Sequence, residues 1–285
     1  MDAATVLALV DAHSAQSEAI QTRVESLAMP TVEEFEQWYS HEAITAMTAT
    51  IVGVVEAGQR QSAALTDAYI ARVLSEMLIE DVAPLGATID PAQLRQGITH
   101  QGVYGRLADQ YRYQTALRIA APLVAAAVLT RARSMIRTDL QLARTHQARR
   151  SLGGNVPGGG RSFGRRGRIE GYRRIIRPEL SKGSVCGICL AASDRVYGVG
   201  DLLPIHPGCV CDVLPIVNGN DPGRDLNDDE LNRLYDDAGT TAMTGLVKQR
   251  YEITEHGEIG PLLINPKHRH RGPDDLPMVL DTSTD

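Results

Sequence analysis

Apolar residues recur at helical spacing through most of the first half of the chain. The pattern runs from Ala3 to Leu27 and again from Val32 to Val55, and Pro30 with Thr31 between these runs is typical of a helix stop followed by an N-cap. A further run, Gln61 to Leu78, repeats the same spacing. These patterns predict three helices before residue 79.

The longest helical pattern spans Val103 to Arg150, and Pro122 is its one interruption. Proline has no N–H and clashes with the preceding turn, so it either kinks one helix or divides the segment into two. The most apolar stretch of the chain, Ile119 to Thr130, lies here between Arg118 and Arg131. Its length of about 12 residues is well short of the roughly 20 that a membrane span needs. We therefore expect a buried helix there, and no membrane contact.

The pattern changes after residue 168 to short extended runs divided by Gly and Pro. An acidic helix follows them, and a hairpin turning at His256-Gly257 comes after the helix. From about Pro266 the sequence is polar and Pro-rich, and we expect a loose tail. The expected strands are Tyr172–Leu180, Val196–Ile205 and Cys211–Val217, the helix is Asp228–Asp237, and the hairpin is Tyr251–Ile264.

Residues 153–168 separate these two halves. The segment contains seven glycines, whose backbone entropy opposes any regular element, together with several arginines. We therefore predict four parts: a helical domain at 1–152, built as a bundle or an extended stalk; a flexible Gly/Arg-rich linker at 153–168; a small Cys/His module at 169–217; and the acidic helix, hairpin and tail at 218–285.

Composition supports an α+β class whose first half is mainly helical. Aromatic residues make up 4% of the chain while Ala, Leu and Val are plentiful, which favours helices packed through small aliphatic side chains. Hydrophobic residues reach 43%, enough to bury a core. The start at Met1 has no basic region ahead of an apolar run, which predicts a cytoplasmic chain.

Positively and negatively charged residues are segregated along the chain. The net charge of −6 gives the protein as a whole no attraction to a polyanion such as DNA. Ten arginines and one acid lie between Arg144 and Arg177, whereas seven acids and two arginines lie between Asp221 and Asp237. Arginine beside flexible glycine can follow a phosphate backbone, which indicates contact with DNA or an acidic partner. The alternative is a solvated linker that pairs loosely with the acidic segment. The candidate contact residues are Arg161, Arg165, Arg166 and Arg168.

All four cysteines lie within 26 positions, together with one of the eight histidines. A C-x-x-C turn places two thiolates on one side of a knuckle, and an H-x-x-C pair can complete a tetrahedral shell. Such soft nitrogen and sulfur ligands suit zinc. The candidate ligands are Cys186, Cys189, His206, Cys209 and Cys211.

Five candidates for four positions leave one side chain spare. Cys209 and Cys211 point the same way in an extended segment, so either can be the fourth ligand. We favour Cys186, Cys189, His206 and Cys209 around one structural zinc ion. Reduced structural thiols and two disulfides are the alternatives.

These residues carry a resemblance to the phage Mu protein F-like (MuF-like) head-morphogenesis family of tailed phages. The family signature is C-x-x-C, a small turn and P-P-x-H-P-x-C-R-C, and the match covers about 30 residues. Leu203 replaces the first proline and Val210 replaces the arginine, which places the chain in a divergent branch. The matching strings are Val185-Cys186-Gly187-Ile188-Cys189 and Leu203-Pro204-Ile205-His206-Pro207-Gly208-Cys209-Val210-Cys211.

The resemblance implies a minor capsid protein that acts in procapsid assembly near the portal. Its implied partners are the portal, scaffold or major capsid protein, with packaged DNA as a further contact of the Arg-rich linker. Its implied location is the host cytoplasm during assembly and then the interior of the procapsid or virion. The string Ala191–Tyr197 looks most like actinobacteriophage members, which are often labelled capsid maturation protease.

Whether the chain is an enzyme is therefore open at the level of sequence. A protease needs a nucleophile, a base and a group that orients the base. Cys209 with His206, or Ser193 or Ser184 with the same histidine, are the candidate pairs, but none lies in a recognisable strand-to-helix elbow. A histidine bound to metal cannot also act as the base. The residues thus favour a binding protein, with a prohead protease as the alternative.

Overall fold

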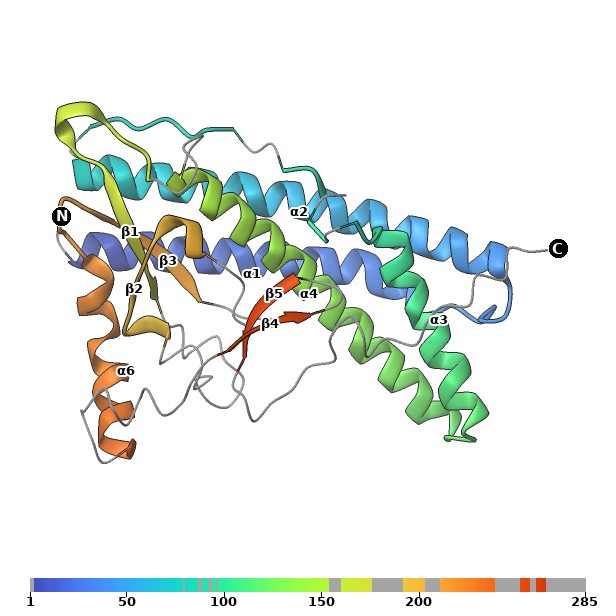
Figure 1. Cartoon of the computed structure of the whole chain (residues 1–285). Coiled ribbons are helices and arrows are strands. Elements are labelled where there is room, and N and C mark those ends of the chain that lie inside the picture. The colour runs from blue at the N-terminus through green and yellow to red at the C-terminus, as the bar shows by residue number, and fades with distance from the viewer. Residues whose placement is uncertain are drawn as a thin grey trace.

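The chain is mostly helical and carries a small antiparallel sheet, as the computed structural model shows (Figure 1). The predicted α+β class with a helical first half is confirmed at this level. Among the described residues, no helix is both long enough and apolar enough to cross a bilayer. The structure describes residues 3–78, 80–86, 89–91, 94–95, 97–153, 160–175, 192–202, 211–238, 252–256 and 260–264.

The long helices form a bundle. α2 packs along both α1 and α4, and α3 packs against α2 and α4 (Figure 1). Hydroxyl groups begin two of them: the Ser40 side chain accepts from the Ala43 N–H, and the Thr99 side chain accepts from the Gly102 N–H. These bonds satisfy donors that the first turn of a helix leaves unpaired. The bounds are α1 (Ala3–Glu33), α2 (His41–Leu78), α3 (His100–Ala116) and α4 (Ala121–Gly153).

The helix stop predicted at Pro30 and Thr31 is wrong. α1 continues through Pro30 to Glu33, and the Pro30 carbonyl still accepts from the Glu34 N–H at 3.0 Å. Proline removes one helical hydrogen bond, whereas Met29 and Val32 on either side of it are buried in the core. Packing on the apolar face therefore holds the helix together across the proline.

The predicted separation of the second and third helices is also wrong, because α2 runs unbroken from His41 to Leu78. Gly58 lies in the gap between the two predicted helices. A Cβ atom at this position would lie 2.4 Å from Val24 Cγ2, so the glycine lets α1 and α2 approach closely. Close packing against the neighbouring helix thus explains the glycine inside this long helix.

The segment from Val103 to Arg150 is divided into two helices, which is one of the two expected outcomes, and the division lies directly before Pro122. The chain turns between Ala116 and Ala121, where Arg118 has a positive φ of 58°. Pro122 lies in the first turn of α4, where its missing N–H needs no helical partner. The burial expected for the apolar stretch after Arg118 is wrong at its start, since Ile119 and Leu123 are exposed.

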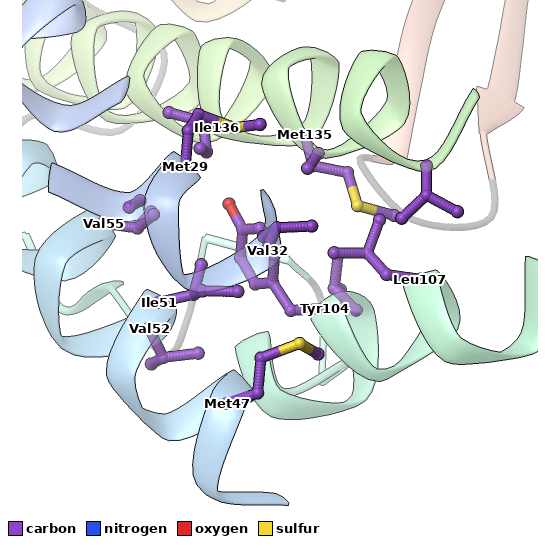
Figure 2. Packing of buried hydrophobic residues seen from close by; sticks show 14 of the residues in the cluster. Met29, Val32, Met47, Ile51, Val52, Val55, Tyr104, Leu107, Met135 and Ile136 are labelled. Atoms are coloured by element: carbon purple, nitrogen blue, oxygen red, sulfur yellow. The ribbon is translucent and has the colours of Figure 1, made fainter. Parts of the chain in front are cut away.

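A hydrophobic cluster fills the middle of the bundle (Figure 2). It takes side chains from all four helices, and Tyr104 is fully buried among them. The labelled members converge from α1, α2, α3 and α4 on one space, which is the packing that amphipathic helices require. They are Met29, Val32, Met47, Ile51, Val52, Val55, Tyr104, Leu107, Met135 and Ile136.

A buried polar cluster around Asp139 lies beside this core. Arg95 Nε donates to Asp139 Oδ1 at 2.6 Å, and the Tyr104 hydroxyl donates to Oδ2 at 2.7 Å. The His100 Nε2 atom lies 3.7 Å from Oδ1, and its Nδ1 lies 3.3 Å from Glu56 Oε1. The carboxylate is fully buried, so a permanent cation and a hydroxyl replace its hydration.

The sheet has the strand order β2-β1-β3, with antiparallel pairing throughout. β3 matches the expected strand at Cys211–Val217 closely, whereas β2 is far shorter than the expected Val196–Ile205. α6 packs against β1, β3 and α1, and it contains the expected acidic helix. The expected hairpin is confirmed as the antiparallel pair β4 and β5. The bounds are β1 (Ile169–Ile175), β2 (Val196–Tyr197), β3 (Asp212–Val217), α6 (Pro222–Ala238), β4 (Glu252–His256) and β5 (Gly260–Ile264), with short 3₁₀ turns η2 (Gly164–Arg166) and η4 (Val199–Asp201).

A second hydrophobic cluster joins the sheet to the bundle. The N-terminal part of α1 and the C-terminal parts of α2 and α4 contact the inner residues of β1 and β3. Tyr172 and Leu214 are fully buried in this contact. The helices and the sheet thus share one core, whose members include Val6, Val10, Ile70, Leu74, Leu152, Ile169, Tyr172 and Leu214.

The described part of the predicted linker, residues 160–168, lies against this core. The Arg161 N–H donates to the Leu152 carbonyl and the Ile169 N–H donates to the Arg161 carbonyl, both at 2.9 Å. A Cβ on Gly160 would lie 1.9 Å from the Ile169 carbonyl oxygen, so glycine there permits a close backbone approach. These bonds hold residues 160–168 in place; residues 154–159 lie outside the described part, and the four-part division stays a prediction.

Candidate functional site

Four of the five predicted metal ligands, Cys186, Cys189, His206 and Cys209, lie outside the described residues. The fifth, Cys211, is half-buried directly before β3. Within the described part of the chain, no three His, Cys, Asp or Glu side chains are grouped as a metal ion would need. The zinc site therefore stays a prediction, and Cys211 marks where the predicted module meets the described fold.

Cys211 lines a pocket at the junction of bundle and sheet. α1, α2 and α4 form one side of this pocket, and β1, β3 and Leu202 form the other. Its volume of about 40 Å³ is room for roughly three water molecules, so it suits a small polar group. The lining residues are His13, Thr66, Tyr69, Gln141, Arg144, Thr145, Ala148, Arg174, Leu202, Cys211, Asp212 and Val213.

Asp212 and His13 form the centre of the junction. His13 Nδ1 donates to Asp212 Oδ1 at 2.6 Å, and the Ser14 hydroxyl donates to Oδ2 at 2.5 Å. Burial would raise the pKa of Asp212, but the charge of His13 and the hydrogen bonds from His13 and Ser14 outweigh it and hold that pKa below its ordinary value. The carboxylate is therefore ionised and orients the imidazole.

The opposite edge of His13 faces α2. His13 Nε2 lies 3.4 Å from the Thr66 hydroxyl, which itself donates to the Ser62 carbonyl at 2.9 Å. The Thr66 hydroxyl has one proton, and it donates that proton to the Ser62 carbonyl. Thr66 can therefore accept a hydrogen bond from His13, but His13 does not activate it as a nucleophile. The Tyr69 ring stacks on the imidazole with centroids 4.2 Å apart, which fixes its plane.

Two arginines give the pocket a cationic lining. Arg174 lies 5.9 Å from the centre of the Tyr172 ring and 6.0 Å from that of Tyr197, which places its guanidinium against aromatic faces. Arg144, on α4, contributes to the lowered pKa of Asp212 through its charge. Chemically, the pocket combines an oriented imidazole, a thiol and two guanidinium groups around one ionised carboxylate.

Of the two serines considered as nucleophiles, the structure describes Ser193. Ser193 is fully buried, and its carbonyl accepts from Arg173 Nη1 at 2.9 Å. A nucleophile must reach its substrate, so burial argues against this serine. Ser184 lies outside the described residues.

The predicted basic contact residues do not share one environment. Arg165 and Arg168 are exposed, whereas Arg161 donates to the Ser151 carbonyl at 3.3 Å and lies 5.2 Å from the Phe163 ring centre. Burial lowers the pKa of Arg161, while the nearby Asp67 raises it. Arg165 and Arg168 thus remain candidates for an outside contact, while Arg161 also serves the fold. The Arg166 side chain lies outside the described part.

One contact between the basic and acidic segments is present in the fold. Arg173 Nε donates to both carboxylate oxygens of Asp221, at 2.8 and 3.0 Å, and its Nη2 donates at 2.6 Å. Arg173 is buried, so this fork-shaped pair ties β1 to the start of α6. Arg173 lies on β1, outside the predicted linker, and its pair with Asp221 is largely buried and tight, so the expected loose pairing of a solvated linker with the acidic segment stays a prediction.

The chain matches no protein-family model, no curated protein and no solved structure. The inference of function must therefore come from the chain's own residues.

Proposed function

We propose that the chain is a minor capsid protein of a tailed phage, and that it acts by binding during procapsid assembly near the portal. The observation that carries this proposal is the Cys/His string from Cys186 to Cys211, which resembles the MuF-like signature. The portal, scaffold or major capsid protein is the proposed partner. The exposed Arg165 and Arg168 are the proposed contacts to packaged DNA or an acidic partner.

The same string is proposed to hold one structural zinc ion. Three thiolates and one imidazole match the ligand chemistry of zinc, and Cys186, Cys189, His206 and Cys209 are the proposed set, with Cys211 as the alternative fourth ligand. Zinc binding would supply folding free energy to a segment with little core of its own.

Elemental analysis of protein purified without chelator tests the zinc site, and we expect about one zinc per chain. Cys189→Ser should abolish zinc binding. Of Cys209→Ser and Cys211→Ser, only the variant that replaces the fourth ligand should abolish it. A zinc-free protein whose four thiols all titrate freely would contradict the site.

The junction between bundle and sheet supports an assembly role. Asp212 follows Cys211 directly and bonds to His13 and Ser14, so the end of the Cys/His string is anchored to the bundle. A partner that binds one part would thereby engage a rigid body rather than a tethered domain.

Coexpression with phage capsid, scaffold and portal proteins tests the assembly role. We expect the wild-type chain to sediment with procapsids. If a capsid protein and not DNA is the partner, the double variant Arg165→Ala with Arg168→Ala should sediment with them equally well. Procapsids of normal yield that never contain the chain would contradict the proposal.

A capsid maturation protease is the second candidate, and one observation favours it. An aspartate-oriented imidazole and a thiol, His13 and Cys211, line the same pocket. This is the set of residue types that a cysteine hydrolase uses, with His13 as base and Asp212 as its orienting group.

Two matched variants separate the candidates. His13→Gln and Ser14→Ala each remove one hydrogen bond to Asp212, but the histidine variant also removes the base. Capsid products that are trimmed with Ser14→Ala and untrimmed with His13→Gln and Cys211→Ser would identify a protease. Untrimmed products with the wild-type chain would favour the binding role.

A further inference from the structure

The tip where α3 turns into α4 is an exposed apolar surface. Four large side chains there are strongly exposed: Tyr113 by 66%, Leu117 by 56%, Ile119 by 36% and Leu123 by 64%. Between them lie exposed small apolar residues, namely Ala116, Ala120, Ala121, Pro122, Ala125 and Ala126. This tip, residues 113–126, projects from the bundle with no other labelled element beside it (Figure 1).

The first turns of α4 are apolar around their whole circumference. Val124 and Val128 are buried on one side of the helix, while Leu123 and Ala126 are exposed on another. A surface helix normally turns a polar face outward, and a helix that is apolar all round is normally buried. The exposed face of the tip therefore has the character of an interface.

Charge is almost absent from this surface. Arg118 is the single charged residue from Tyr113 to Thr130, and it lies at the turn itself. Polar and charged residues, Asp109 and Arg112 on α3 and Arg131 on α4, follow away from the tip. An apolar patch with a polar rim marks a site of protein contact in soluble proteins.

We propose that the tip binds the tip of a second copy of the chain. The four large residues are exposed by 36–66%, so at roughly 200 Å² for a residue of this size they expose about 450 Å² per copy, and the exposed small residues enlarge the patch. Two copies would thus cover roughly 900 Å² of large apolar residues, and the small residues add to this, so the contact can pass the roughly 1,000 Å² expected of a specific interface.

The composition of the tip favours self-association over a charged partner. In an isologous contact the same patch of each copy faces the other, so the patch must not repel a copy of itself. The patch has no acid and one arginine, so most of its surface meets that condition, and it offers little charge to steer an acidic or basic partner. The exposed alanines allow two helical hairpins to approach closely, as in a four-helix arrangement.

Sedimentation velocity of the full chain tests the proposal, from about 1 to about 200 μM. We expect reversible dimers in the wild-type protein and at least a tenfold weaker association for Leu117→Glu and Leu123→Glu. The matched control is Leu27→Glu on α1, because Leu27 is exposed by 55% but lies outside the tip. Circular dichroism should show unchanged helicity in all variants, since each replaced side chain is exposed.

Two further readouts locate and characterise the contact. Amide exchange in residues 113–126 should slow as the concentration rises, and added NaCl should not weaken the dimer because its contact is apolar. A monomer over the whole range would overturn the proposal, and so would dimers that Leu27→Glu disrupts as strongly as Leu123→Glu. Slow exchange of the tip in a dilute monomer would assign the surface to another segment of the same chain.

Discussion

Two buried aspartates organise the molecule, and they are partnered in different ways. Asp139 lies inside the bundle against Arg95, the Tyr104 hydroxyl and His100, all drawn from residues 95–104. Asp212 lies at the junction of bundle and sheet, where His13 and Ser14 come from the far end of the chain. Burial opposes ionisation of both, and their partners hold the pKa of each below its ordinary value.

The difference separates a structural cluster from a candidate site. Arg95 is fully buried, and its guanidinium closes the Asp139 cluster as part of the core. His13 is an imidazole, whose ring nitrogens can donate or accept a hydrogen bond, and it lines a pocket together with further polar groups. A buried carboxylate is therefore a candidate for function where its partner is an imidazole that lines a pocket, and a structural element where its partner is a guanidinium enclosed in the core.

The largest effect is expected from Arg95→Met. The variant keeps the aliphatic volume but leaves Asp139 as a buried charge without its cation, which should lower the free energy of unfolding by about 3–5 kcal/mol. Urea denaturation followed by circular dichroism measures it. Arg72→Met, which breaks an exposed pair with Glu76, is the control and should cost under about 0.5 kcal/mol. Equal costs for the two would remove the structural role of the cluster.

Asp212→Asn should have an intermediate effect. The amide keeps the size of the side chain but loses the charge that binds His13, which should cost about 1.5–3 kcal/mol. Amide exchange should accelerate in β3 and the first turns of α1 more than in the bundle core. Asp201→Asn replaces an exposed carboxylate of the same region and should change neither. Uniform acceleration across the bundle would contradict a junction-specific contact.

The two clusters should also differ in pH dependence. Both aspartates have lowered pKa values, so their stabilisation is present above the unfolded value of about 3.9 and is lost as pH falls through the folded values. The His100 pKa is raised: burial lowers it, but the hydrogen bonds and charge of Asp139, with Glu56, outweigh this. Its contribution is present below the unfolded value of about 6.5 and is lost as pH rises through the folded value.

His100→Gln should therefore remove a decline in stability above about pH 6.5 that the wild type shows. Asp212→Asn should leave this alkaline decline in place and reduce the acid one. Denaturation series at matched pH values measure both. An alkaline slope that survives in His100→Gln would assign it to another group.

The smallest effect is expected from Glu56→Gln. Glu56 is half-buried and lies 3.3 Å from His100 Nδ1, so its loss should cost under about 1 kcal/mol at neutral pH. The variant should shift the alkaline decline to lower pH, because one of the groups that raises the His100 pKa is gone. A shift to higher pH would show that the carboxylate is not the partner.

Local pattern predicted the elements well where a short apolar run or a turn sequence decides the structure. β3 was predicted within one residue, because its apolar run is buried on both faces, and the β4–β5 hairpin followed from its turn. Pro30 misled the prediction, because the packing of Met29 and Val32 outweighs a local helix breaker. The apolar run after Arg118 was expected to be buried, but it is exposed at its start. A hydrophobic pattern shows that a segment favours burial, and it does not show which surface would cover that segment.

The candidate site was predictable in one of its parts. Cys211 belonged to the Cys/His string, and Asp212 is its neighbour, but His13 stands in an ordinary amphipathic helix and carries no motif. Its role depends on a contact across 199 positions, which no local spacing reports. Only the three-dimensional proximity of His13 to Asp212 shows this role.

That separation has a consequence for how the protein is made. A ribosome adds about 5–20 residues per second, so His13 leaves it roughly 10–40 s before Asp212 does. Throughout this interval the first turns of α1, with Val6 and Val10, have no sheet to cover them. The nascent helices present an uncovered apolar end for a time much longer than helix formation itself takes. The beginning of the chain is thus among the last parts to reach its final packing, and the yield of folded protein should depend on how well the cell shields that end during translation.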